Sequence, residues 1–533
     1  MIVKNIQIAE VSQLSSRDKD YYIDSKKFSQ FLQYDFSYEA LKEAISNRKS
    51  FPVDRKTLFE LVETQYCRIT SSDLTKSNIE SLKAENTFTI TTAHQPSLLG
   101  GPLYYVYKIL SAINLSQRLK EDYKNSNFVP IFVIGGEDHD YEEINHLHLF
   151  GNKITWESTD SGSVGKFSME GIEDVLTQVE EILGDKSKII DFISELKAFA
   201  KSSTNYGDFS FKFTHALFDR FGLVILRMDD AKLKRLFIPI IKQEIFESPS
   251  IDIINKTQYA LDEMGYKAQT HIREINFFYR SKSLRNRIEK VNNDYKIVDT
   301  DISFTEAELN SEIENHPENF SPNVIMRPLF QSLILPDLVY IGGGGELAYW
   351  MERKTHFEFF KLHFPLLIRR RSALILSEST LKQSQKLGLS FDDLFQEEDD
   401  LIKRYLAKSD KHNFDLTQYK DQLEDLFKKL ELEVSETDKN LTQTTQVEKV
   451  KAIKSIDYLE SKLKKSIKQK EEVNLKRISK LKAKYFPSGL QERHDNILEY
   501  LSQYGTELLD KFLEHSDPFD KQFKIFIMQS QDR

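Results

Sequence analysis

An apolar strand-like run, a polar loop, a helical stretch and a second strand-like run with its own loop follow one another in this chain. The first run, residues 88–92, leads into a loop that contains His94, and the second run, residues 129–134, leads into Gly135-Gly136-Glu137-Asp138-His139-Asp140. Between them, apolar residues recur at steps of mostly three and four over residues 103–123, which is typical of a helix. This order predicts a βαβ unit with two parallel strands.

Parallel strands place their carboxyl ends at one edge of a sheet, and ligands bind there in open α/β folds. Both polar loops follow such strand ends. We therefore expect two histidines, His94 and His139, to lie at one mouth together with the acids Glu137, Asp138 and Asp140. The fold class that this indicates is α/β with a parallel-sheet core.

Composition narrows the class of protein. A chain of 533 residues is too long for one simple core, so we expect two or three domains. The net charge of −9 and the pI near 5.9 argue against nucleic acid as a partner. No apolar run is long enough to cross a membrane, and the N-terminus does not resemble a signal peptide. Cys67 is the single cysteine, which excludes an internal disulfide and favours a reducing, cytoplasmic location.

The rest of the chain divides by character. Residues 1–85 are predicted to be helical and polar. Residues 218–227 are predicted to form a helix end, a glycine turn and a buried strand, and short strands are expected at 270–274, 277–280 and 365–368. From about residue 386, glycine and proline nearly vanish. Apolar residues then advance by threes and fours, which predicts an antiparallel helical hairpin or coiled coil. We expect three parts: a catalytic core over 1–385, a coiled coil over 386–486, and a segment over 487–533 that returns to the core as a strand.

The loop after the second strand has two interpretations. Glu137-Asp138-His139-Asp140, with Glu143 and His146 nearby, could form an acid/base or metal site, because histidine and carboxylates transfer protons and bind divalent ions. It could also be a solvated surface loop. The spacing matches no zinc motif.

Two glycine-containing turns are candidates for anion binding. His94-Gln95 followed by Gly100 and Gly101 is similar in logic to the first signature loop of adenylate-forming Rossmann enzymes, where histidine and a helix start meet phosphate. Gly342–Gly345 with Glu346 lies between a strand-like run and a helix, where free amides can receive an anion. The glycine run could also be only a turn. Arg327 could bind a carboxylate through two hydrogen bonds.

Motifs along nearly the whole chain resemble the bacillithiol-synthesis cysteine ligase family, BshC. They are Thr92-Ala93-His94-Gln95, Leu99-Gly100-Gly101-Pro102-Leu103-Tyr104 with Lys108, Glu137-Asp138-His139-Asp140, Ser321-Pro322-Asn323 with Arg327-Pro328, Tyr340-Ile341-Gly342-Gly343 with Glu346-Leu347-Ala348-Tyr349-Trp350, and Leu490-Gln491-Glu492-Arg493. The family usually has Gly-Gln-Gln where this chain has Ala93-His94-Gln95, so a relative functions with glutamine in place of His94. It also often has a proline near Gly344.

The resemblance implies a ligase that adds L-cysteine to glucosaminyl-malate by forming an amide bond, in the last step of bacillithiol synthesis. It also implies a Rossmann-like core with inserted segments and a coiled coil that pairs two subunits. ATP or ADP is the candidate cofactor, and the source of activation stays open. His139 or Asp138 would take the amine proton.

The implied site has two groups of residues and no metal ligands. The catalytic group is Glu137, Asp138, His139 and Asp140. The substrate- or nucleotide-binding group is His94, Gln95, Gly100, Gly101, Lys108, Asn323, Arg327, Gly342, Gly343, Glu346, Tyr349 and Trp350.

Two rival hypotheses remain at this point. The first is a metal-dependent hydrolase built on His94, Asp138, His139 and His146. The second is a scaffold whose coiled coil recruits partners while the α/β part only binds a metabolite.

Overall fold

A computed structural model describes residues 1–281, 283–390, 392–409, 416–487 and 489–529. The chain forms two compact units. The larger unit comprises residues 5–374 and 490–524, and the smaller unit comprises residues 1–4, 375–489 and the C-terminal end from residue 525. Among the described residues, no helix is long and apolar enough to span a membrane.

The larger unit contains the predicted parallel sheet. Its strands are β2 (Thr87–His94), β3 (Asn127–Ile134), β6 (Val224–Arg227), β12 (Asp337–Gly342) and β13 (Leu366–Arg369). They are all parallel and lie in the order β13-β12-β2-β3-β6. Both faces are covered, so the strands are buried along almost their whole length. The strand order reverses between β2 and β12, which is the position where such sheets bind ligands.

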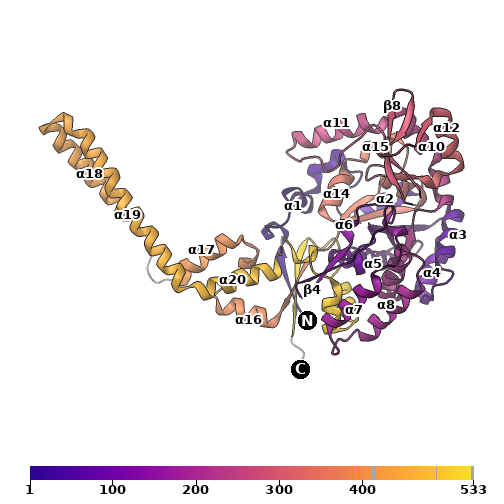
Figure 1. Ribbon diagram of the computed structural model, residues 1–533, viewed down its shortest axis with the longest axis horizontal. Helices are drawn as coiled ribbons and strands as arrows, with labels where there is room; N and C mark the ends of the chain where they lie inside the picture. The colour runs from indigo at the N-terminus through magenta and orange to yellow at the C-terminus, as the bar shows by residue number, and fades with distance from the viewer. Residues whose placement is uncertain (282, 391, 410–415, 488, 530–533) are drawn as a thin grey trace. The chain divides into compact units, whose positions relative to one another are not determined.

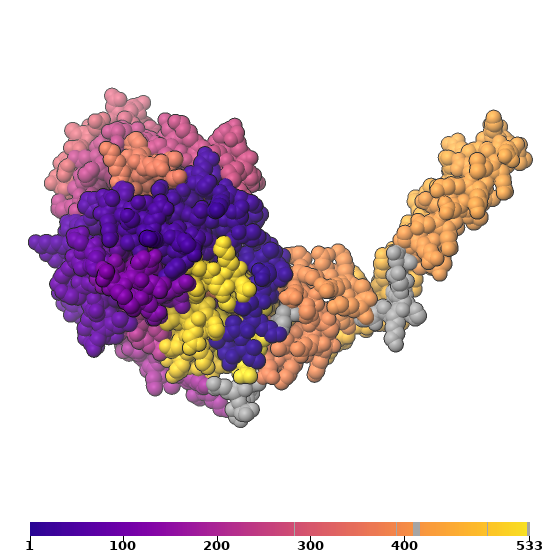
Figure 2. Space-filling view, turned by 180° about the vertical axis from the view of Figure 1, so that it is seen from behind, coloured from indigo at the N-terminus to yellow at the C-terminus, as the bar shows by residue number. Residues whose placement is uncertain are grey.

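Helices on the sheet confirm the predicted βαβ unit. The linking helix α5 (Tyr104–Asp122) packs against β2, β3 and β12 (Figure 1). Residues 1–85 are mostly helical, as predicted, although they begin with a strand. Their elements are β1 (Ile2–Gln7), α1 (Ser16–Ile23), α2 (Ala40–Arg48), α3 (Arg55–Tyr66) and α4 (Asp73–Ser81). In the larger unit, residues 490–524 lie against this N-terminal part, where the Phe519 ring stacks on Phe36 at 5.5 Å (Figure 2).

Insertions between the parallel strands carry most of the remaining elements. They are α6 (Tyr141–Ile144), β4 (His146–Leu149), β5 (Asn152–Thr155), α7 (Ile172–Leu183), α8 (Ile190–Ser202), α9 (Tyr206–Phe218), α10 (Ala231–Glu247), α11 (Pro249–Glu263), α12 (Glu306–Asn315), α13 (Arg327–Ile334), α14 (Gly344–Met351) and α15 (Lys354–Phe359), with α21 (Ile497–Tyr504) and α22 (Leu508–Glu514) near the C-terminus.

A second, antiparallel sheet lies within the largest insertion. Its order is β10 (Ser303–Thr305), β9 (Asp294–Ile297), β8 (Arg285–Val291), β7 (Phe277–Arg280) and β11 (Phe320–Pro322). The strand expected at 277–280 is confirmed as β7. The strand expected at 270–274 is wrong, because these residues are irregular. Their polar side chains instead bond to buried groups, as when Thr270 Oγ1 donates to Glu352.

The smaller unit is largely helical, as predicted. Its helices are α16 (Glu378–Lys386), α17 (Glu398–Ser409), α18 (Thr417–Thr437), α19 (Thr442–Lys470) and α20 (Glu472–Tyr485). Lys420 Nζ meets Glu460 Oε2 at 2.7 Å and Gln446 Nε2 donates to Glu431 Oε1 at 2.8 Å, so α18 and α19 run antiparallel. The strand expected at 523–528 is present within β15 (Gln522–Met528), in a sheet of order β1-β15-β14 with β14 (Ala373–Ser377).

An ion pair between a buried lysine and a partly exposed glutamate ties the two sides of the strand-order reversal together. Lys108 on α5 donates from Nζ to Glu346 Oε1 at 2.8 Å and to the carbonyl oxygen of Ala93 at the end of β2. Glu346 in the first turn of α14 also accepts from the Tyr340 hydroxyl at 2.9 Å and from the Gly343 amide at 2.8 Å. Burial alone would raise the pKa of Glu346, but the Lys108 charge and the hydrogen bonds from Gly343 and Lys108 together lower that pKa. The pair therefore fixes the turn after β12 against the end of β2.

Removal of one partner should cost stability. We expect Lys108→Met to lower the free energy of unfolding by about 1–3 kcal/mol, because the partly buried Glu346 carboxylate loses the cation that Lys108 supplies. Lys108→Met combined with Glu346→Gln should lose less, since the amide can still accept from Gly343. Urea unfolding measures both values. Equal losses in the single and double variants would contradict this account.

Candidate active site

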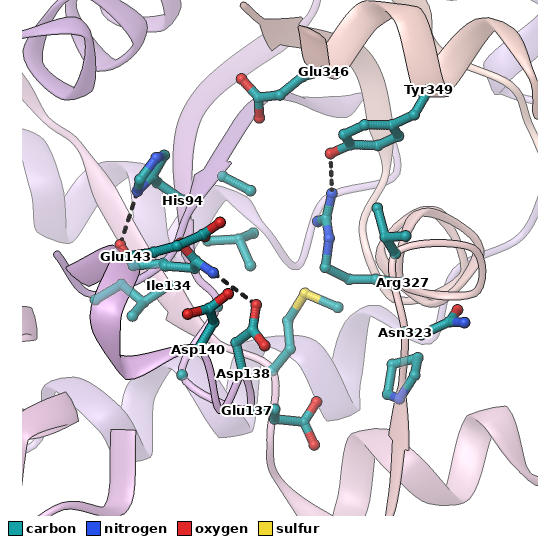
Figure 3. A pocket seen from close by; sticks show the side chains of 18 of the residues that line it. His94, Ile134, Glu137, Asp138, Asp140, Glu143, Asn323, Arg327, Glu346 and Tyr349 are labelled. Carbon is teal, nitrogen blue, oxygen red and sulfur yellow. Dashed lines mark hydrogen bonds between the residues drawn. The ribbon is translucent and has the colours of Figure 1, made fainter. Parts of the chain in front are cut away.

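A cavity of about 870 Å³ opens at the carboxyl ends of the parallel strands. Each of the five strands supplies part of its lining through the residues that end or follow it. The lining residues are Ala93, His94, Gln95, Tyr104, Val133 to Asp140, Glu143, Met228, Asp229, Arg285, Pro322 to Val324, Arg327, Gly343 to Glu346, Tyr349, Arg370 and Arg493. In Figure 3, Arg327, Tyr349 and Glu346 lie on a different side of the hollow from Asp138, Asp140 and Glu143.

Asp138 is held in place by three neighbours. Its Oδ2 accepts from Gln95 Nε2 at 2.7 Å, and its Oδ1 accepts from Arg285 Nη1 at 3.3 Å and from the His139 amide at 2.8 Å. Burial would raise the pKa of Asp138, but hydrogen bonding from His139, the Arg285 charge and the Gln95 amide together lower it far below its usual value. Asp138 is therefore a fixed carboxylate that joins the loops after β2 and β3.

His139 shares the same arginine. Arg285 Nη1 donates to His139 Nδ1 at 2.5 Å, so the ring proton of neutral His139 lies on Nε2. About half of the His139 side chain is exposed, 49%, and the Arg285 guanidinium lies 4.0 Å from the centre of the Phe278 ring. In this arrangement His139 presents a hydrogen-bond donor, and Nδ1 can act as a base only after Arg285 leaves it.

Glu137 is committed to the surrounding structure. Both of its oxygens accept from Lys234 Nζ, at 2.9 and 3.0 Å, and the Lys234 side chain is fully buried. Arg280 Nη1 lies 3.6 Å from Glu137 and 3.7 Å from Asp229. Burial lowers the pKa of Lys234 to about 8. These contacts tie the acid loop to α10 and β7, whereas Asp140 and Glu143 are exposed, and neither has a cation within 4.0 Å among the described residues.

His94 does not carry the positive charge that a phosphate-binding histidine would supply. Its Nδ1 donates to the Gln95 carbonyl at 3.0 Å, and burial, with help from the Lys108 charge, lowers its pKa to about 4. His94 is therefore neutral near pH 7. The side chain lines the cavity, and its predicted role in binding an anion stays a prediction for a neutral imidazole.

Arginines form the basic part of the lining. Arg327 donates from Nη1 to Gln331 Oε1 and from Nη2 to the Tyr349 hydroxyl, both at 3.1 Å, and no described carboxylate lies within 4.0 Å of it. Arg493 is exposed and likewise has no described carboxylate within 4.0 Å. Arg370 differs, because its Nη2 is bonded to the buried Glu492 at 2.8 Å. Two cations at the cavity are thus unpaired.

Five predicted binding residues lie outside the lining: Gly100, Gly101, Lys108, Gly342 and Trp350. Lys108 is buried beneath the cavity, and Trp350 packs in the core with its ring 4.3 Å from that of Tyr340. Gly101 has φ +57°, and a Cβ there would approach the Ser97 Cβ to 2.7 Å. None of these five residues faces the cavity. The other predicted residues line the cavity.

Sequence reasoning missed Arg285 as a lining residue and gave no role to Tyr104, although Tyr104 belongs to a quoted motif. Arg285 comes from β8, which is 147 residues away from Asp138 along the chain. No local pattern marks such a residue. Arg493 had a signal, because it ends the motif that begins at Leu490.

The metal-dependent hydrolase has no support in the geometry. Within the described ranges, no three histidine, cysteine or carboxylate side chains gather in a way that could hold a metal ion. His146 is outside the cavity lining and lies beside His148, whose ring stacks on that of His494 at 3.9 Å.

The neutral state of His94 has a consequence for pH dependence. The pKa of His94 in the folded protein, about 4, is below the value of about 6.5 in an unfolded chain. Its stabilising contribution is therefore present above pH 6.5 and is lost as the pH falls toward 4. We expect the wild type to lose more unfolding free energy than His94→Gln between pH 7.5 and pH 5, by urea unfolding. The same loss in both proteins would show that His94 titrates normally.

Two family descriptions cover nearly the whole chain. Residues 1–371 match "Bacillithiol biosynthesis BshC, N-terminal Rossmann-like domain", and residues 373–528 match "Bacillithiol biosynthesis BshC, C-terminal coiled-coil domain". A protein of Flavobacterium johnsoniae is 39% identical, with 95% of this chain and 96% of that protein aligned. One of Christiangramia forsetii is 37% identical over 95% of both chains, and one of Bacillus mycoides is 29% identical over 97% and 98%. All three are named "Putative cysteine ligase BshC". The chain therefore belongs to the BshC family of bacillithiol biosynthesis.

Proposed function

We propose that this protein is a ligase that joins the carboxyl group of L-cysteine to the amine of glucosaminyl-malate, in the last step of bacillithiol synthesis. The names of its relatives and the family to which it belongs support a cysteine ligase. The observation that carries the proposal is the distribution of unpaired charge in the cavity. Arg327 and Arg493 are free cations, and Asp140 and Glu143 are free carboxylates.

The basic part of the cavity suits the malate group, which carries two carboxylates. An arginine can bind a carboxylate through two parallel hydrogen bonds. Arg327 is pre-oriented by Gln331 and Tyr349, so little side-chain entropy is lost when a carboxylate binds. The turn at Gly343–Gly345 lies at the N-terminus of α14 and adds the favourable end of a helix dipole.

The acidic part of the cavity suits the amine. Asp140 and Glu143 are exposed to the cavity and would attract a protonated amine of either substrate. Amide formation requires that the attacking amine lose a proton, and a carboxylate within hydrogen-bond reach can accept it. Asp138 is less suited to this task, because its lone pairs are already engaged by Gln95, Arg285 and His139.

The cysteine carboxyl must be activated before the amine attacks it. In the reaction, the carboxyl carbon forms a bond to the amine nitrogen and releases its activating group, and the amine proton passes to a base. ATP or ADP is our candidate nucleotide. The Gly345 position fits a close ligand, since a Cβ built there would meet no atom within 4 Å. A bound nucleotide would supply the leaving group.

We propose that His139 assists this step as a hydrogen-bond donor from Nε2. Arg285 holds Nδ1 and thereby fixes the ring. A donor at this position would stabilise the negative charge that develops on the carbonyl oxygen during attack. The alternative role, general base through Nδ1, requires Arg285 to move away.

Variants of His139 test both the reaction and this role. The chain would be produced in cells that make glucosaminyl-malate but lack the final enzyme, and bacillithiol would be measured by mass spectrometry. We expect thiol with the wild type and a loss of about 10²–10³-fold in rate with His139→Ala, the range for removal of one oxyanion donor. His139→Gln keeps an N–H donor without a basic nitrogen, so it should retain more activity than His139→Ala.

The outcomes separate the ideas. No bacillithiol from a folded wild-type protein would overturn the proposed reaction. Equal, large losses in His139→Ala and His139→Gln, with a changed pH profile, would instead identify His139 as the base. Unchanged activity in both variants would exclude His139 from the chemistry.

We also propose that the protein acts as a homodimer in the cytoplasm. On α18 and α19 no described residue is buried, yet large apolar side chains are exposed along them. They include Leu426, Leu430, Val447, Val450, Leu459 and Leu463. Exposed apolar side chains on a long helical hairpin are typical of a pairing surface. The exposed free thiol of Cys67 fits a reducing compartment.

Polar substitutions of these exposed apolar residues should separate the subunits. We expect Leu426→Glu with Leu459→Glu to convert a dimer to a monomer at micromolar concentration, because two charges would be buried in the interface. Light scattering measures the mass. Lys465→Glu, at an exposed lysine of α19, is the control, and it should leave the dimer intact. A monomeric wild type, or a dimer that survives the double substitution, would contradict the proposal.

A further inference from the structure

A chain of buried side chains leads from the cavity wall into the core. Asn323 lines the cavity, and its Nδ2 donates to Asn276 Oδ1 at 3.0 Å. Asn276 Nδ2 in turn donates to Glu244 Oε1 at 2.6 Å. Ser250 donates to the other Glu244 oxygen, and its hydroxyl lies 2.7 Å from His356 Nε2. Apart from Asn323, these side chains are fully buried.

The carboxyl of Glu244 lowers the stability of the fold at this buried position. It lies on α10 with no exposed surface and without a described cation within 4.0 Å. A buried carboxyl without a cation is destabilising unless hydrogen bonds compensate. Burial raises the pKa of Glu244 to about 7 even though Ser250 and Asn276 bond to it. The hydrogen bonds from Ser250 and Asn276 offset part of this cost and tie the carboxyl to the chain of contacts.

Glu244 sets the orientation of the Asn276 amide. Both Asn276 N–H groups are used, one by Glu244 and one by the Arg273 carbonyl at 2.8 Å. The Asn276 oxygen accepts from Asn323 Nδ2 and from the Arg273 amide at 3.3 Å. If the amide were reversed, its N–H groups would face these two donors. An acceptor at the position of Glu244 therefore keeps the Asn276 oxygen pointed at Asn323.

Asn323 in turn builds the turn that carries Arg327. Asn323 Oδ1 accepts from the amides of Ile325 and Met326, at 2.8 and 3.3 Å. The Arg327 amide donates to the Asn323 carbonyl at 2.9 Å, and α13 begins at Arg327. Asn276 accepts the hydrogen bond from Nδ2 and thereby keeps the Asn323 Oδ1 directed at these two amides. The position of the unpaired Arg327 cation thus depends on the chain of contacts.

We propose that Glu244 is a positioning residue for the anion-binding wall of the cavity and acts through Asn276 and Asn323 on Arg327. The assignment of the anion to glucosaminyl-malate rests on the proposed function, whereas the mechanical link from Glu244 to Arg327 does not. Glu244 itself touches no substrate.

Three variants test the link by steady-state kinetics of the full chain. We expect Glu244→Ala and Asn276→Ala to raise the KM for glucosaminyl-malate by about tenfold, the effect of losing about 1.4 kcal/mol of binding. The KM for L-cysteine should change by less than about twofold, within the scatter of distant sites. Glu244→Gln should restore the wild-type KM, because its amide oxygen accepts from Asn276 and its N–H can donate to Ser250.

Two controls separate positioning from a loss of stability. Ile245→Ala changes a buried neighbour on the same helix, so it should lower the unfolding free energy and leave both KM values unchanged. In an Arg327→Ala background, Glu244→Ala should raise the KM no further, since the group it positions is gone. Additive effects in that background would overturn the proposal. So would a KM change as large in Glu244→Gln as in Glu244→Ala.

A measurement without substrate distinguishes failure of this inference from failure of the proposed function. The amides of residues 325–327 should exchange hydrogen faster in Glu244→Ala than in the wild type or in Glu244→Gln. If the wild type makes no bacillithiol but this pattern holds, the proposed function fails and the link stands. Unchanged exchange in Glu244→Ala overturns the link whatever the protein catalyses. If Glu244→Ala does not fold, Asn276→Ala serves in every comparison.

Discussion

The ion pair between Lys108 and Glu346 holds together the point on which the cavity depends. In a parallel sheet whose order reverses, the loops on either side of the reversal diverge and leave a crevice. Lys108 reaches across it from α5, contacting both the end of β2 through Ala93 and the turn after β12 through Glu346. Because the Lys108 side chain is buried, water and salt screen this pair less than they screen an exposed pair. The crevice therefore keeps a fixed width, and the side chains on its rim keep their distances.

Most charged groups around the cavity form ion pairs with one another. The groups without such a partner among the described residues indicate which ligands the cavity can bind. Glu137 is bound by Lys234, Asp138 by Arg285, and Arg370 by Glu492. Such pairs position loops but offer little to a ligand. The unpaired groups are two arginines and two carboxylates, so the ligands that fit best carry both carboxylate and amine. Cysteine and glucosaminyl-malate meet that requirement together. Glu244 has a similar positioning role deeper in the core, because its carboxyl orients the Asn276 amide, which in turn holds Asn323 in the turn before Arg327.

The parts of the fold that follow local rules could be predicted from the sequence. The βαβ unit around α5, the strand at 277–280 and the helical hairpin each have a clear apolar period, because one face must be buried. The acid loop was placed at the cavity because it follows a strand end, whereas Asn323 and Arg327 were chosen because they belong to motifs that resemble the family. The strand at 270–274 was wrong, since Glu352 accepts hydrogen bonds from the Thr270 hydroxyl and from the Gln269 amide next to it. Lys108 and Trp350 were expected at the ligand and are buried instead, because the motif does not reveal which way a side chain points.

The sequence by itself determined the parallel-sheet class, the helical hairpin and the stretch of chain in which the chemistry lies. These follow from the period of apolar residues and from the glycines that turns require. Only the tertiary structure decided the state of each group. Arg285 comes from a distant strand to lower the pKa of Asp138 and to occupy Nδ1 of His139, and burial beside Lys108 leaves His94 neutral. The charge of a side chain and the position of its proton depend on its neighbours in space. Local sequence patterns do not determine how close two remote segments of the chain come to each other.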